Sequence, residues 1–72
     1  MPKCLVTTDD RKQYEVERDK ITFLDDFGRP TKHQATMVVL PVLKPRADLV
    51  FGDGEGNVMN LGEITGVIWK RN

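Results

Sequence analysis

Residues with reactive side chains are few in this 72-residue chain, and they are scattered. His33 is the single histidine, and the polar stretch around it indicates an exposed position. Cys4 is the single cysteine, and because Leu5 and Val6 follow it we expect a small buried hydrophobe rather than a reactive thiol. Neither residue stands in a pattern that supplies a nucleophile together with its base.

Two carboxylate pairs, Asp9-Asp10 and Asp25-Asp26, are the other candidates for chemistry. Adjacent residues on an extended chain point to opposite sides, so neither pair can converge on one bond as a general acid and base. One histidine and one cysteine are also too few for a zinc site. We therefore expect no enzymatic activity, no catalytic residue, no cofactor and no metal.

The glycines of the segment 52–57 alternate with other residues and suggest a ligand-binding loop. A phosphate-binding loop needs Gly-Lys-Ser/Thr after its glycines, but Asn57 and Val58 follow here. A calcium-binding EF-hand loop needs glycine at its sixth position and glutamate at its twelfth, which are Val58 and Ile64. The segment is better explained as the turn of a β-hairpin.

Composition predicts one small domain spanning residues 1–72, with 39% hydrophobic and 31% charged residues. Eleven Lys and Arg balance eleven Asp and Glu, so no bulk charge attracts nucleic acid or a membrane. The longest apolar run, Met37 to Leu43, contains Pro41 and is too short to span a bilayer. Without a targeting signal or a second cysteine, we expect a cytoplasmic protein that does not associate with membranes.

Short segments with strand patterns must position these residues. Residues 4–8 and 13–18 predict a hairpin, because Tyr14 and Val16 alternate with polar neighbours. Residues 21–23 either extend its second strand or form another. The stretch from Leu24 to Thr36 predicts a loop with room for one helical turn over residues 31–35, since Gly28 and Pro30 interrupt it.

The second half of the chain predicts further strands. The apolar run 36–40 is typical of a strand covered on both faces. Residues 47–51 and 58–61 predict a hairpin across the glycine-rich turn, and Gly62 is expected to end its second strand. A last strand over residues 63–70 would place Val67 and Trp69 on one face and Ile64 and Ile68 on the other.

These elements predict a mainly β fold: a small antiparallel sheet or partly closed barrel with at most one short helix. The residues expected to be buried in it are Val38, Leu40, Val67 and Trp69.

The segment from Ile21 to Phe27 combines large apolar residues with two acids, and it is the candidate partner-binding site. Its expected contact residues are Ile21, Phe23, Asp25, Asp26 and Phe27. Such a patch would suit a basic, amphipathic segment of another protein. The alternative is that Phe23 and Phe27 simply close the core.

A second alternative comes from three small basic clusters: Arg29 with Lys32, Lys44 with Arg46, and Lys70 with Arg71. If they met on one face beside Tyr14 or Trp69, a small β-barrel protein that binds single-stranded nucleic acid would result. The neutral net charge argues against this.

Read whole, from the opening MPKCLVTTDD to the closing VIWK, the chain resembles small lytic-phage regulators that bind the bacterial RNA polymerase of the host. The resemblance spans the full length but includes no diagnostic motif, so no contact residue can be transferred. It implies a protein that docks on a large polymerase subunit, interferes with sigma-factor function in initiation and promotes antitermination.

Overall fold

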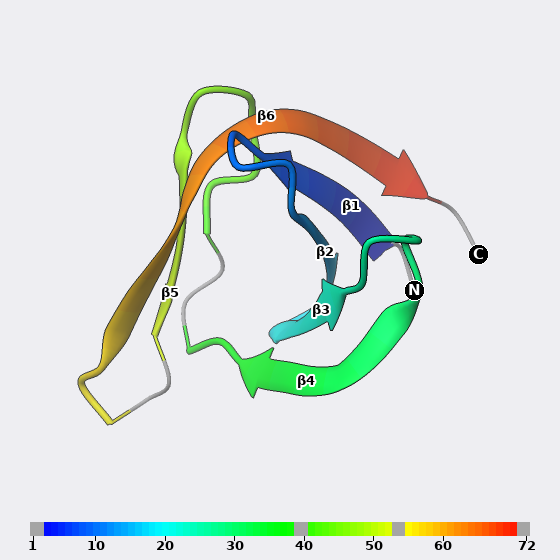
Figure 1. The fold of residues 1–72 in the computed structure, drawn as a ribbon. Helices are drawn as coiled ribbons and strands as arrows, with labels where there is room; N and C mark the ends of the chain where they lie inside the picture. The colour runs from blue at the N-terminus through cyan, green and yellow to red at the C-terminus, as the bar shows by residue number, and fades with distance from the viewer. Residues whose placement is uncertain (1–2, 39–40, 53–54, 71–72) are drawn as a thin grey trace.

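The computed structural model describes residues 3–38, 41–52 and 55–70, and they form one curled antiparallel sheet of six strands (Figure 1). No helix occurs among these residues, so the predicted mainly β fold is confirmed. The strands lie in the order β4-β3-β2-β1-β6-β5. Their bounds are β1 Lys3–Thr8, β2 Gln13–Glu17, β3 Lys20–Leu24, β4 Pro30–Thr36, β5 Asp48–Gly52 and β6 Val58–Lys70.

The β1–β2 hairpin is confirmed. Val6 lies opposite Tyr14 and Cys4 opposite Val16, and all four side chains are buried. Since cross-strand partners share a face, they define the inner face of the sheet, which carries the core. The turn is closed by a hydrogen bond from the Thr8 backbone N–H to the Lys12 carbonyl at 3.0 Å.

The segment 20–36 forms two strands: residues 21–23 lie in a separate strand, one of the two alternatives expected, and a further strand replaces most of the expected loop. β3 is a separate strand paired with β2, and β4 pairs with β3 from Pro30 to Thr36. The prediction of a loop with a helical turn was therefore wrong. β4 lies at the edge of the sheet and is mostly exposed, so its sequence lacks the apolar alternation that marks a half-buried strand.

Residues 36–40 were predicted to form a buried strand, which is wrong for the described part. Thr36 ends β4, while Met37 and Val38 lie outside any strand, and residues 39 and 40 are not described. Met37 is buried and its backbone N–H bonds to the Asp19 carbonyl, but Val38 is 65% exposed. The Val38 N–H donates to the Gly52 carbonyl at 3.3 Å, which links the end of β4 to β5.

The second hairpin, β5–β6, is confirmed, but Gly62 does not end its second strand. β6 continues for 13 residues and changes partner on the way. Its first part pairs with β5 as far as Glu63, and its second part pairs with β1 from Ile64 onwards. Gly62, with φ at 109°, lies where the strand leaves one partner for the other.

A β-bulge in β6 places Ile64 on the opposite face from the predicted one, while Val67, Ile68 and Trp69 lie on their predicted faces. Thr8 of β1 lies opposite Ile64 of β6, and Val6 lies opposite Val67. Two residues separate the pairs along β1 but three separate them along β6, so β6 contains one extra residue. The extra residue in β6 reverses the alternation, so Ile64 and Val67 share the inner face. Ile64 is buried and Val67 packs half-buried against the core.

The core fills the inner face and draws on β1, β2, β3, β5 and β6. Its buried members are Cys4, Val6, Tyr14, Val16, Ile21, Met37, Leu49, Phe51 and Ile64. None of the described segments forms a helix long and apolar enough to cross a membrane.

Candidate protein-binding surface

The turn between β3 and β4, residues 25–29, is held in one conformation by Asp25, and we call it the Phe27 turn. The Asp25 carboxylate accepts hydrogen bonds from the backbone N–H groups of Phe27 at 2.9 Å and Arg29 at 2.8 Å. The Asp25 N–H donates to the Arg29 carbonyl at 2.9 Å, and Gly28 takes the positive φ of 76° that the turn requires. The Gly28 N–H also donates to the Asp25 carbonyl at 3.0 Å, so hydrogen bonds within the turn fix four residues, Asp25, Phe27, Gly28 and Arg29.

Phe27 stands at the exposed side of this turn. Its side chain is 84% exposed, the largest value among the exposed large apolar residues of the described segments. The Arg29 guanidinium lies 5.9 Å from the ring centroid, within cation–π range. An aromatic ring left in water on a fixed turn is available to a partner.

Phe23 belongs to an aromatic row on the inner face of β2, β3 and β4. Its ring meets Tyr14 edge-on, with centroids 5.1 Å apart, and it stacks on His33 with centroids 4.0 Å apart. The Thr31 hydroxyl donates to the Phe23 carbonyl at 2.6 Å and fixes β4 against β3 at this point. Phe23 is half-buried, while His33 is exposed as predicted.

The five predicted contact residues therefore separate into three environments. Ile21 is fully buried on the inner face, opposite Val16, so it has no surface to offer and belongs to the core. Phe23 is half-buried, and the Asp25 carboxylate is engaged inside the turn. Asp26 and Phe27 are exposed.

Sequence reasoning missed a second group of exposed apolar residues, at the end of β6. Trp69 was predicted to be buried but is 63% exposed, and its neighbour Ile68 is 58% exposed. The reason is topological: β5 pairs with β6 only as far as Glu63, so on the side away from β1 no strand of the described residues lies beside the second half of β6. The spacing of apolar residues carries no signal for the length of a partner strand.

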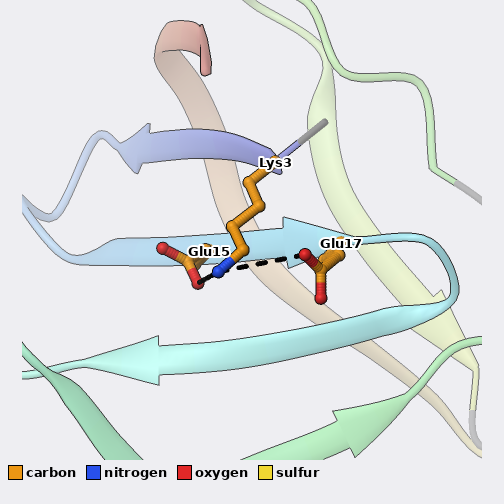
Figure 2. Close-up of polar contacts among 3 residues, drawn as sticks. All are labelled: Lys3, Glu15 and Glu17. Atoms are coloured by element: carbon orange, nitrogen blue, oxygen red, sulfur yellow. Dashed lines mark ion pairs between the residues drawn. The ribbon is translucent and has the colours of Figure 1, made fainter. Parts of the chain in front are cut away.

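The outer face of β1 and β2 carries a small ion-pair cluster, drawn in Figure 2. Lys3 Nζ lies 3.8 Å from Glu15 Oε1 and 3.9 Å from Glu17 Oε2. All three side chains are substantially exposed, so each pair contributes at most about 1 kcal/mol to stability. Lys3 also lies opposite Lys70 of β6, so two positive residues are neighbours on this face.

Burial and hydrogen bonding shift three titratable groups. Burial raises the pKa of the Cys4 thiol, which keeps it protonated and poorly nucleophilic. Burial, reinforced by the negative charge of Asp10, raises the pKa of Tyr14. A hydrogen bond from the Thr8 hydroxyl lowers the pKa of Asp10. Within residues 3–38, 41–52 and 55–70, no cluster of three or more His, Cys, Asp or Glu side chains could hold a metal ion.

Comparison with protein-family models, with curated proteins and with solved structures finds no match for this chain.

Proposed function

We propose that this protein is a phage-encoded transcription regulator that docks on a large subunit of bacterial RNA polymerase through the Phe27 turn. It inhibits sigma-dependent initiation and promotes antitermination without chemistry of its own. The full-length resemblance to small lytic-phage regulators supports the choice of partner. The single structural observation that supports docking is Phe27, 84% exposed on a turn fixed by hydrogen bonds.

The Phe27 turn is preorganised for binding. Binding energy at protein interfaces concentrates in a few aromatic or arginine anchors that enter desolvated pockets. Phe27 and Arg29 are such residues, and they already contact each other on a turn that loses little further freedom on binding. Asp26, exposed beside them, adds a negative charge that speeds encounter with a basic surface.

The test is binding to core RNA polymerase, measured together with in-vitro transcription from a sigma-dependent promoter. Phe27→Ala should weaken binding about thirtyfold, corresponding to about 2 kcal/mol, and relieve inhibition in parallel. Val42→Ala is the matched control, because Val42 is also an exposed apolar residue, at 61%, and lies outside the turn. The proposal fails if saturating wild-type protein neither binds core enzyme nor changes initiation or termination.

One observation favours a second candidate, binding of single-stranded nucleic acid. Trp69 is exposed next to Lys70, and a base could stack on its ring. The other basic clusters lie on separate segments. Arg29 directly precedes β4 and Lys32 lies within it, while Lys44 and Arg46 precede β5. A steep fall in affinity with salt would identify this activity, since phosphate contacts release counterions and an apolar anchor does not.

A further inference from the structure

The second half of β6, from Thr65 to Lys70, has one strand edge without a partner among the residues that the structure describes. β1 pairs with one side of this segment, and the β5 pairing on the other side ends at Glu63. The last bonds on that side join Ile64 to Arg46 and Ala47. In Figure 1 the red end of β6 accordingly lies beside β1 with no strand on its other side. Because alternate residues of a strand direct their N–H and C=O groups to opposite edges, this free edge presents a row of open backbone groups.

The two outermost strands, β4 and β5, each carry a feature that hinders strand addition. β4 begins with Pro30, which has no N–H to donate, and carries the exposed Lys32. At β5, the Val38 N–H occupies the Gly52 carbonyl. The segment 65–70 contains no proline, and Lys70 is its single charged residue. An edge that no described strand covers, with exposed Ile68 on the outer face and exposed Trp69 on the inner face, is a template for strand addition.

Charge decides between the possible occupants of this edge. Lys70 lies opposite Lys3, whose ammonium group is shared by Glu15 and Glu17 (Figure 2). Lys70 itself has no ion pair with any residue that the structure describes. A second copy of this chain would bring the same segment, in which none of residues 65–70 can place a carboxylate beside Lys70. An incoming strand with an acidic residue would neutralise Lys70 instead.

We propose that the free edge of β6 binds an extended, apolar segment of a partner protein that carries a carboxylate beside Lys70. Main-chain hydrogen bonds to residues 65–70 supply the affinity, and contacts with Ile68 and Trp69 on the two faces supply selectivity. This surface is separate from the Phe27 turn, so it can be tested without RNA polymerase and can fail or hold independently of the proposed function.

The probe is a synthetic peptide of about six alternating valine and threonine residues, a typical strand length, with a glutamate at each end so that either strand direction places one near Lys70. Amide hydrogen exchange is followed by NMR with and without peptide. The outward-directed amides of residues 65–70 should exchange about tenfold more slowly, or slower still, at saturating peptide. A peptide methylated on alternate backbone nitrogens should give no protection, because it cannot complete the ladder.

Lys70→Glu provides the charge control, since Lys70 is exposed and its replacement leaves the core untouched. This variant should prefer the same peptide with lysine ends, whereas the wild type prefers glutamate ends. The proposal is overturned by an absence of protection at millimolar peptide or by equal binding of the methylated peptide. If the amides of residues 65–70 exchange more slowly as the protein concentration rises, without peptide, a second copy of the chain occupies the edge. If oligodeoxythymidine changes the NMR signal of Trp69 at lower concentration than the peptide does, the edge binds nucleic acid instead.

Discussion

Gly62 lies against the carboxylate of Asp9, and a Cβ atom added to the glycine would stand 2.9 Å from Asp9 Oδ1. The glycine also has φ at 109°, in the region that L side chains rarely adopt. It lies where β6 passes from β5 to β1, so any strain there acts on both halves of the sheet.

Gly62→Ala should lower the free energy of unfolding by about 1–3 kcal/mol, because alanine is strained at this φ and its methyl group displaces Asp9. Urea denaturation measures the change. Gly56→Ala is the matched control: its φ is 91°, but nothing lies within 4 Å of an added Cβ. A cost for Gly62→Ala no larger than that for Gly56→Ala would contradict the proposed crowding.

Asp25→Ala should release the Phe27 turn, because two backbone N–H groups lose their acceptor. We expect a loss of about 1 kcal/mol in stability and weaker binding to RNA polymerase. Asp25→Asn retains the acceptor oxygen and should behave almost like wild type. If Asp25→Asn binds as poorly as Asp25→Ala, the negative charge rather than the turn geometry is what the partner requires.

The stability of the protein should fall at alkaline pH. Burial raises the pKa of Cys4 above its ordinary 9.0 and that of Tyr14 above its ordinary 10.0. Both groups are neutral when protonated, so their contribution is complete below these ordinary values and is lost as pH rises through the folded-state pKa values. The free energy of unfolding, measured in urea between pH 8 and pH 11, should therefore decrease.

The alkaline prediction has its own controls. Cys4→Ala and Tyr14→Phe each cost stability at neutral pH for packing reasons, so the quantity to compare is the slope with pH. Each variant should show a shallower alkaline decline than wild type. An unchanged slope in both would assign the decline to other groups.

Trp69 should report an exposed indole. It is the single tryptophan of the chain and is 63% exposed, so the tryptophan fluorescence of the protein reports the solvent exposure of the end of β6. Acrylamide should quench it about as efficiently in the native protein as in urea. Strong protection of the native indole would show that the end of β6 is covered.

Sequence pattern predicted the elements that have one buried and one exposed face. Tyr14 and Val16 alternate with polar residues because β2 packs on the core from one side only, and this period is readable from sequence. β4 carries no such period because it lies at an edge, with most of its residues exposed. Edge position depends on the order of strands, which the local sequence does not encode.

The candidate site was predicted in part for a related reason. The exposed Asp26 and Phe27 lie in a turn marked by Gly28, and turn chemistry is local. Ile21 was assigned to the same surface because it is near in sequence, but the pairing of β3 with β2 turns it inward. Val67 and Trp69 share one face of β6 and Ile68 takes the other, as predicted, but Ile64 was assigned to the wrong face because one bulged residue separates it from Val67.

The pairing of β1 with β6 has a consequence for how the chain folds as it is made. Lys3 lies opposite Lys70, so the pairing of β1 with β6 joins residues from the two ends of the described chain. Contacts of such long sequence separation raise the contact order, and high contact order slows folding. The β1–β2–β3 meander can assemble as it leaves the ribosome, but one edge of β1 must wait uncovered until β6 has been synthesised. During that interval the apolar inner face of the meander lacks the core residues of β5 and β6, and it is then that a chaperone would bind the nascent chain best.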